Sequence, residues 1–454
     1  MSTDAMVTTE TTEVRANNQW DALFENFEQR VEANSPAWLM SLRRAGNAHF
    51  AELGFPTTED EEWRFTNVRP IAELSPQAGP SNVRLTEKEI ASFIYGTMVS
   101  RRLVFVDGRY NAQLSAPGKN DGVQVLNLAT AIQADENVLT QHLARYARYD
   151  DNAFAALNTS MIEDGVVITI GAKQKIEEPI FLLFVSTGRI AGAITNPRIL
   201  VVAHAGSDAK VIEKYVTIGD QPHFTNVVTE LVLEENARLE HCKIQDESLN
   251  AFHVATIQAY QKRNSHLLTH SISLGAAIAR NNVIPVLDAE GCECTMNGLY
   301  LGRNTQLVDH HTSIHHAKPH CNSHEFYHGI LDGKSQGVFN GKIFVRPDAQ
   351  KTDAKQTNRN LLLSNDATIH TKPQLEIFAD DVKCTHGATV GQLEDEHIFY
   401  LRARGIGLEM ARRMLVHAFA SDIVNRITIE EIRAELDELF YDRFERSTES
   451  SRGH

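Results

Sequence analysis

Apolar and polar residues alternate along the stretch from residue 332 to residue 391. Phe339, Ile343 and Val345 share one parity, and turn-forming pairs such as Asn365-Asp366 separate the apolar pieces. A period of two residues is typical of short strands with one buried face, and Asn and Asp favour the turns between them. No apolar stripe with a helical period interrupts the stretch. It therefore predicts a run of short strands.

The strand pattern begins near Gly165 and continues to about Val390. Strand-like pieces follow one another at 180–185, 198–203, 210–216, 226–233, 237–244, 255–261 and 267–274. Many short strands without long crossover helices indicate a sheet that coils, and a stacked solenoid leaves few backbone groups without partners. Because no strict repeat length can be aligned, this pattern alone leaves a β-helix and a β-sandwich open.

Helical periodicity marks the region before the strands. Ser35 followed by Pro36 predicts an N-cap and a first helical residue, and this helix should end at Leu53, before Gly54. An earlier helix is predicted by Trp20, Leu23, Phe24, Phe27 and Val31. An α+β unit is completed by a helix near 86–95, a strand at 103–106 and a helical run at 138–148. Within the block Glu61-Glu-Trp-Arg-Phe-Thr, we expect Trp63 and Phe65 to pack while the charges face water.

A helical period returns after Glu396. One apolar stripe comprises Leu408, Ala411, Leu415, Ala418 and Phe419. Thr428 is placed to cap a last helix, with acidic residues near its positive end. The apolar face of that helix comprises Ile432, Leu436, Leu439, Phe440 and Phe444. From the pattern alone, these helices either cap the run of strands or present an apolar face to a partner.

Composition narrows the class of protein. The hydrophobic content of 42% is that of a globular chain, and no stretch reaches the length of a membrane span. The N-terminus lacks the basic and apolar regions of a signal peptide, so we expect a cytoplasmic protein. A net charge of −15 argues against nucleic acid as a partner. The five cysteines are too scattered for a disulfide framework.

Three short motifs need weighing as possible metal or nucleotide sites. Gly333-Lys334-Ser335 resembles the end of a P-loop, but position 328 is His where that motif needs Gly, so we expect no nucleotide on this chain. Cys292 and Cys294 are expected to be packed core residues. The segment 309–328 is rich in histidine, which makes a His-rich metal-binding protein an alternative, although the spacing fits no closed zinc pattern. These residues are His310, His311, His315, His316, His320, His324 and His328, with Cys321.

Cys384 and His386 stand two residues apart in a predicted strand, so both side chains leave the same face. A thiolate and an imidazole side by side could bind iron or hold a persulfide sulfur. On spacing alone, packing is the more common reason for such a pair.

Several ordered blocks resemble the SufB/SufD family, whose members form the scaffold of the SUF iron–sulfur cluster assembly machine. They are Gly341-Lys-Ile, Ala349-Gln-Lys-Thr-Asp-Ala, Asn360-Leu-Leu-Leu-Ser, Pro373-Gln-Leu-Glu-Ile, Cys384-Thr-His-Gly-Ala-Thr-Val-Gly and Phe399-Tyr-Leu-Arg-Ala-Arg-Gly-Ile. The resemblance implies a mainly β fold: a right-handed parallel β-helix between an N-terminal mixed region and a C-terminal helical domain. With the patterns above, it predicts a disordered tail at 1–16 and domains at 17–160, 161–395 and 396–454.

Two positions resemble the SufD branch of the family more than the SufB branch. Gly387 stands where SufB-like chains carry Glu, and Ala367 stands where they carry a sulfur-accepting Cys. The resemblance implies a non-catalytic scaffold subunit that pairs its β-helix with a SufB-like paralogue. It also implies binding of a SufC-like ABC ATPase through the C-terminal helices, with Leu408, Ala411, Leu415 and Phe419 as candidate contacts.

The resemblance also implies a function for Cys384 and His386. It implies that His386, with Cys384, contributes to a nascent iron–sulfur cluster held transiently and shared with SufB. The alternative from another class is a polysaccharide-active enzyme on a β-helix, which needs paired carboxylates or calcium ligands in an exposed groove. No such grouping is evident on consecutive predicted strands, so we expect no enzymatic activity.

Overall fold

The computed structural model describes residues 19–450, except residues 81, 82, 97, 99, 120 and 135, and the side chains of 136 and 441–450 are also outside the description. The predicted disordered tail at 1–16 and the Phe444 side chain therefore lie outside the described residues. No described helix is long and apolar enough to cross a membrane.

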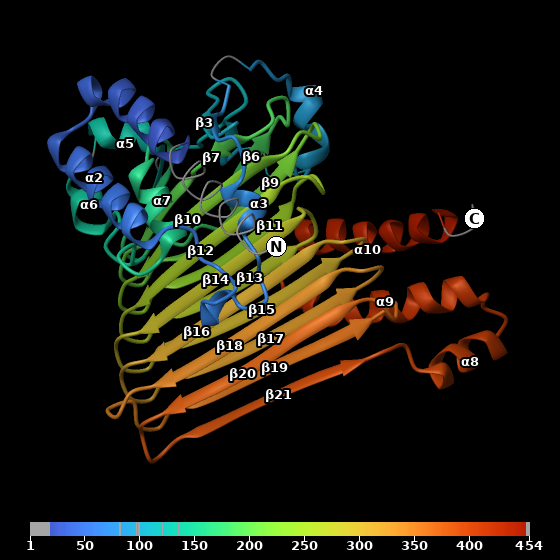
Figure 1. Ribbon diagram of the computed structural model, residues 1–454. Coiled ribbons are helices and arrows are strands. Elements are labelled where there is room, and N and C mark those ends of the chain that lie inside the picture. The colour runs from blue at the N-terminus through green and yellow to red at the C-terminus, as the bar shows by residue number, and fades with distance from the viewer. Residues whose placement is uncertain are drawn as a thin grey trace, which may run out of the picture.

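Two stacks of parallel strands form the body of the molecule (Figure 1). One sheet has 11 strands and follows the order β20-β18-β16-β14-β12-β10-β8-β5-β4, and the other has 10 strands and follows β21-β19-β17-β15-β13-β11-β9-β6-β2-β3. The chain alternates between the two sheets, so from β8 onward each strand pairs with the strand two places further along. This is a parallel β-helix, as expected, and it excludes the β-sandwich.

The strands of the first sheet, sheet A, within the β-helix are β5 (Gly165–Ile170), β7 (Ala193–Thr195), β8 (Arg198–Ala203), β10 (His223–Leu233), β12 (Phe252–Gln261), β14 (Ile278–Leu287), β16 (Leu307–His316), β18 (Gln336–Val345) and β20 (Thr368–Ile377). Those of sheet B are β6 (Ile180–Ser186), β9 (Asp208–Thr217), β11 (Arg238–Asp246), β13 (His266–Ser273), β15 (Glu293–Gly302), β17 (Asn322–Leu331), β19 (Asp353–Leu362) and β21 (Lys383–Gly391).

The N-terminal region contains a helix over residues 19–31 and many short elements. These are η1 (Glu32–Asn34), α2 (Ala37–Leu53), η2 (Glu61–Trp63), α3 (Arg69–Ala72), β1 (Gln77–Ala78), α4 (Glu87–Ile90), η3 (Ala91–Phe93), β2 (Arg102–Val106), β3 (Arg109–Tyr110), β4 (Val123–Asn127), α5 (Leu128–Ala134), α6 (Glu136–His142) and α7 (Ala153–Ser160). The C-terminal helices are α8 (Asp395–Ala403), α9 (Leu408–Val424) and α10 (Glu430–Ser450).

The interior of the β-helix follows from the alternation in sequence. Along β19, Ala354, Gln356 and Asn358 are buried in the interior while Lys355 and Arg359 are exposed. Most interior residues are apolar and form one continuous core that runs the length of the solenoid. Each fully buried apolar side chain of Val, Leu, Ile or Phe size contributes about 1.5–3 kcal/mol.

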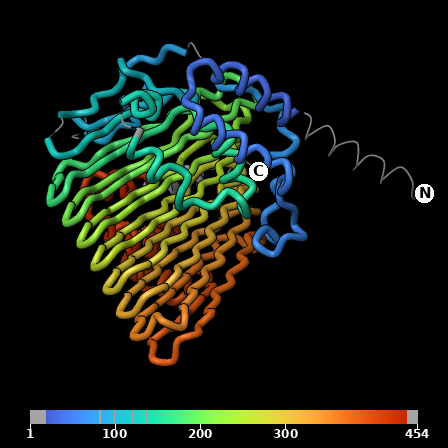
Figure 2. Tube along the Cα trace, turned by 90° about the vertical axis from the view of Figure 1, so that its left-hand side faces the viewer, coloured from blue at the N-terminus to red at the C-terminus, as the bar shows by residue number. Residues whose placement is uncertain are grey.

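Helices cover the outer faces of both sheets. The N-terminal helices pack on sheet A, where Trp20 and Phe154 join Phe224 and Val254 in one apolar cluster. The C-terminal helices lie beside sheet B, where Ile423 joins a cluster of outward side chains from the strands. One N-terminal segment instead descends beside the rungs of the C-terminal half, as the blue tube in Figure 2 shows.

Two predicted helix boundaries are wrong, each for a local reason. The second helix begins at Ala37 with Pro36 as N-cap, and the Ser35 hydroxyl donates to the Val31 carbonyl instead of capping.

The other boundary concerns the helical run predicted over residues 138–148. It ends at His142, because the Glu230 carboxylate accepts the backbone N–H groups of Ala144, Tyr146 and Ala147 at 2.8, 2.8 and 3.0 Å.

Candidate functional site

The last strand, β21, closes one end of the β-helix and is itself uncovered. It pairs with β19 on one side, and among the described residues no strand pairs with its other edge. Most of its residues are exposed, including Val390. An exposed edge of this length presents a row of unpaired N–H and C=O groups, which is a template for another chain.

Cys384 and His386 both lie on β21, and the structure places them on one face of it, two residues apart. Cys384 is half-buried against the interior core, and this burial raises the pKa of its thiol. His386 is exposed. In the β19–β21 register they lie beside Ala354 and Gln356, whose side chains fill the interior. The pair therefore lies at the open end of the solenoid, formed by β21 and its exposed edge, which we call the mouth. There the imidazole is accessible to a partner and the thiol is half-buried.

The histidine-rich segment does not form a metal centre. Its side chains alternate between the two faces of β16 and β17, and the described residues contain no group of three or more His, Cys, Asp or Glu suited to a metal ion. His310 lies inside, with its ring centroid 5.1 Å from that of Tyr300 and 5.4 Å from that of Tyr327. Burial lowers the pKa of His310 to about 3, so it is neutral at physiological pH.

The remaining short motifs are parts of the solenoid. Cys294 and Cys292 are buried in the core, as predicted, and the thiols of Cys292 and Cys321 both donate to the Ala289 carbonyl, at 3.1 and 3.2 Å. The segment 333–335 forms the turn between β17 and β18, whereas a P-loop would lead into a helix.

The residues of the C-terminal stripe lie in different environments, and Ala418 is exposed. Ala411 is fully buried, and Phe419 stacks on His328 of β17 with ring centroids 4.6 Å apart. Leu415 is half-buried, and Leu408 is exposed. The other large apolar side chains exposed in α8 and α9 are Phe399, Tyr400, Met410 and Met414, with Phe399 exposed by 74%.

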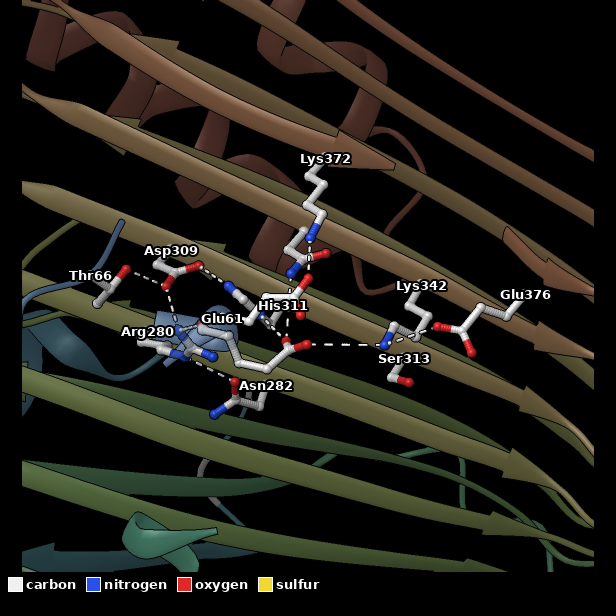
Figure 3. A network of polar contacts seen from close by, with 12 residues as sticks. Glu61, Thr66, Arg280, Asn282, Asp309, His311, Ser313, Lys342, Lys372 and Glu376 are labelled. Carbon is white, nitrogen blue, oxygen red and sulfur yellow. Dashed lines mark hydrogen bonds and ion pairs between the residues drawn. The ribbon is translucent and has the colours of Figure 1, made fainter. Parts of the chain in front are cut away.

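A second polar site joins the N-terminal block 61–66 to the C-terminal half of sheet A (Figure 3). At its centre, Arg280 on β14 donates to Asp309 on β16 at 2.8 Å, and both side chains are buried. The Thr66 hydroxyl donates to the same carboxylate oxygen, and His311 Nε2 lies 3.1 Å from the other. Burial alone would raise the pKa of Asp309, but Arg280 and His311 hold it well below its usual value.

Around this centre the block makes further contacts with residues of β14, β16 and β20. Glu62 Oε2 lies 3.2 Å from His311 Nδ1, and Lys372 on β20 donates to Glu61 at 2.7 Å. Trp63 lies 3.6 Å from the Arg280 guanidinium, as expected of a packed residue, whereas Phe65 stays 39% exposed while stacking on His370. We call this set the clasp: residues 61–66 with Arg280, Asp309, His311, His370 and Lys372. A cavity of about 560 Å³ lies beside it.

Sequence reasoning missed the clasp, because its two halves are more than 200 residues apart and neither the block 61–66 nor the histidine-rich segment indicates that they meet. The exposed mouth, by contrast, carries one of the blocks that resemble a known family, and comparison with other proteins tests that resemblance. A family model described as "SUF system FeS cluster assembly, SufBD core domain" matches residues 184–419, and one described as "SufBD protein N-terminal region" matches residues 14–182. The chain belongs to the SufBD family of iron–sulfur cluster assembly proteins.

Relatives of this SufBD protein extend over nearly its whole length. An iron–sulfur cluster assembly SufBD family protein of Synechocystis is 33% identical over 424 residues, covering 90% of this chain and 92% of the relative. The iron–sulfur cluster assembly protein SufD of Escherichia coli is 32% identical over 430 residues, covering 93% and 95%. SufD of Bacillus subtilis is 23% identical, covering 88% and 93%. The family recognised from its motifs is confirmed, and this SufBD protein is a homologue of SufD.

Proposed function

We propose that this SufD homologue is a non-catalytic scaffold subunit that pairs with a SufB-like paralogue through the open end of its β-helix. The exposed edge of β21 carries this proposal, since it is a long strand edge that no described strand covers. Proteins seldom leave such an edge bare, because it invites pairing with other copies. A β-helix on the partner would continue the rungs and cover the exposed residues.

The C-terminal helices provide the second contact, with a SufC-like ABC ATPase. Family membership supports this partner, and the exposed apolar side chains of α8 and α9 supply a surface for it. The surface comprises Phe399, Tyr400, Leu408, Met410 and Met414, of which Leu408 also belongs to the stripe predicted from the helical period. Exposed aromatic and Met side chains are enriched at the centres of protein interfaces.

His386, with Cys384 as the weaker second ligand, contributes to the nascent cluster at the SufB contact. Support comes from their position at the mouth of the solenoid, where the partner's own ligands can reach them. The cluster is cargo shared between subunits, and its iron needs a neutral imidazole and a deprotonated thiol. Because burial raises the pKa of the Cys384 thiol, this residue gives up its proton less readily than an exposed cysteine.

A proline substitution tests the pairing. The Lys383 N–H donates to β19, so in this parallel register the N–H of Ala388 points to the free edge. Ala388→Pro removes one edge donor and no bond to β19, whereas Ala388→Val keeps the donor and serves as control. Native mass spectrometry of the chain co-expressed with both partners should show the SufB pairing lost in the proline variant alone. Normal assembly of the proline variant would contradict pairing through this edge.

A second experiment tests the cluster site in the same complex. His386→Ala should leave assembly and melting temperature unchanged but lower the iron and acid-labile sulfide content. Cys384→Ser should lower them less. A normally assembled and normally loaded His386→Ala complex would contradict the assignment of this residue.

A further inference from the structure

A column of interior side chains runs down from His386 into the solenoid. The strand register pairs His386 of β21 with Gln356 of β19, and Gln356 with Glu325 of β17. Gln356 and Glu325 are both buried on the inner face. Neighbouring strands lie about 4.7–4.9 Å apart, so in-register side chains on one face stack directly on one another. The three residues therefore form one stack that begins at the mouth and ends two rungs inside.

The orientation of the Gln356 amide is fixed from two sides. Its Nε2 donates to Glu325 Oε2 at 2.7 Å. On the opposite sheet, Gly341 makes room for it, because a Cβ at residue 341 would lie 2.2 Å from this nitrogen. Any other residue at 341 would push the amide away from its place.

This orientation leaves one acceptor unused. Gln356 Oε1 is buried and has no hydrogen-bond partner among the described residues. A buried acceptor without a partner costs about 1–3 kcal/mol, so its retention needs an explanation. The nearest rung on the open side of the stack is β21, and the residue there is His386.

We infer that Gln356 is the positioning residue for His386: its Oε1 accepts one imidazole N–H and leaves the other ring nitrogen free to bind iron. The inference rests on the proposed role of His386. A metal-binding histidine nearly always donates its second N–H to a fixed acceptor, which sets the tautomer and the ring orientation. Glu325 acts one step further back, because it holds the amide nitrogen and leaves the amide oxygen without a partner.

The experiment measures binding of Fe²⁺ alone to the assembled complex under anaerobic conditions. Gln356→Met keeps the length of the side chain and removes the acceptor, and we expect it to weaken iron binding about 10–100-fold. Glu325→Gln keeps an oxygen that accepts from the Gln356 amide, so its iron affinity should remain near that of the wild type. Normal iron affinity in Glu325→Gln would support a positioning role for Gln356. If the role were merely structural, iron affinity would fall in each variant together with its melting temperature.

A further variant covers the case in which Gln356→Met alone disturbs the fold by leaving Glu325 without its donor. Glu325→Met with Gln356→Met makes the column wholly apolar, and it should bind iron as weakly as the single variant. Wild-type iron affinity in either Met variant, in a complex with a normal melting temperature, overturns the inference.

The His386→Ala variant distinguishes this outcome from failure of the proposed function. If His386→Ala binds iron normally, the site itself is misassigned. If His386→Ala binds weakly while the Met variants bind normally, only the positioning role fails.

Discussion

The clasp and the mouth lie on the same β-helix and treat their polar groups in opposite ways. In the clasp, Arg280 and Asp309 are buried, and Arg280 also donates to the Glu62 carbonyl at 2.7 Å and to Asn282 at 3.0 Å. At the mouth, the edge of β21 is exposed and the acceptor of Gln356 has no partner among the described residues. The chain closes the clasp with its own N-terminal block but leaves the mouth to be completed from outside.

This difference teaches which polar groups serve the fold and which serve a partner. Charges that the chain satisfies internally cost stability when one member is removed, because the other is left buried and unpaired. Groups that the chain leaves open contribute little to its own stability, so their substitution should be felt in assembly. The predictions below test that division, in order of falling effect on the stability of the free chain.

The largest effect is expected from breaking the centre of the clasp. Arg280→Leu leaves the Asp309 carboxylate buried without its guanidinium, which should lower the free energy of unfolding by about 3–5 kcal/mol. Urea denaturation measures this change. Lys372→Ala, at the exposed pair with Glu61, is the control and should cost less than about 1 kcal/mol. A loss below about 1 kcal/mol in Arg280→Leu would show that the clasp is not closed in the way described.

Glu325→Gln, close to the mouth, should change how the free energy of unfolding depends on pH. Burial raises the pKa of Glu325 to about 7 from an ordinary 4.5, so between these values the folded carboxyl keeps a proton that the unfolded one loses. The free energy of unfolding of the wild type therefore falls as the pH rises through this range, by about 3 kcal/mol in all. The free energy of unfolding of the variant does not fall in this way. The variant should therefore become more stable relative to the wild type between about pH 5 and pH 8. If the free energies of unfolding of the two proteins changed with pH in parallel, the raised pKa of Glu325 would be contradicted.

A smaller effect is expected at the rim of the clasp. The hydrogen bond from His311 is the main cause that lowers the pKa of Glu62 below 4.5. The stability it contributes is thus present above about pH 4.5 and is lost as the pH falls through the folded-state pKa. Because Glu62 is half-exposed, Glu62→Gln should cost less than about 1 kcal/mol near pH 7 and a smaller amount near pH 3. Chemical denaturation at both pH values checks this, and an equal cost at both would point to packing instead.

The smallest effect on stability should come from Phe399, which is exposed on α8. Phe399→Ser should change the free energy of unfolding by no more than about 0.5 kcal/mol, as is usual for surface substitutions. Its binding to the ATPase should weaken by more than about 1 kcal/mol if this residue lies at the centre of the contact. Titration calorimetry measures the affinity, with Glu396→Ser on the same helix as control. An unchanged affinity would show that the proposed ATPase partner binds another surface.

The strands were predictable because their signal is local. Alternation along β19 and β21 is enough by itself to put Cys384 and His386 on one face, and their neighbours Ala354 and Gln356 follow the same parity. Family motifs then decided between a β-helix and a β-sandwich, which alternation alone could not.

Features set by docking were not predictable. The stripe predicted for α9 includes Ala411, but Val416, Ala420 and Ile423, which make up much of the buried face of this helix, lie outside it. The contact between Glu62 and His311 joins residues 249 positions apart, and the path of the N-terminal block decides it. The end of α6 depends likewise on Glu230, which reaches it from a distant strand. The role of Gln356 needed the register of three strands.

The order of synthesis gives the C-terminal helices a further importance. They cover the outward apolar side chains of sheet B, including Ile244, Ile272, Leu299 and Ile330, yet they leave the ribosome after every strand of that sheet. A nascent chain that has emerged only as far as β21 therefore shows a bare apolar sheet face to the cell. A premature stop after residue 391 would make that condition permanent, so the product should depend on chaperones and be degraded quickly.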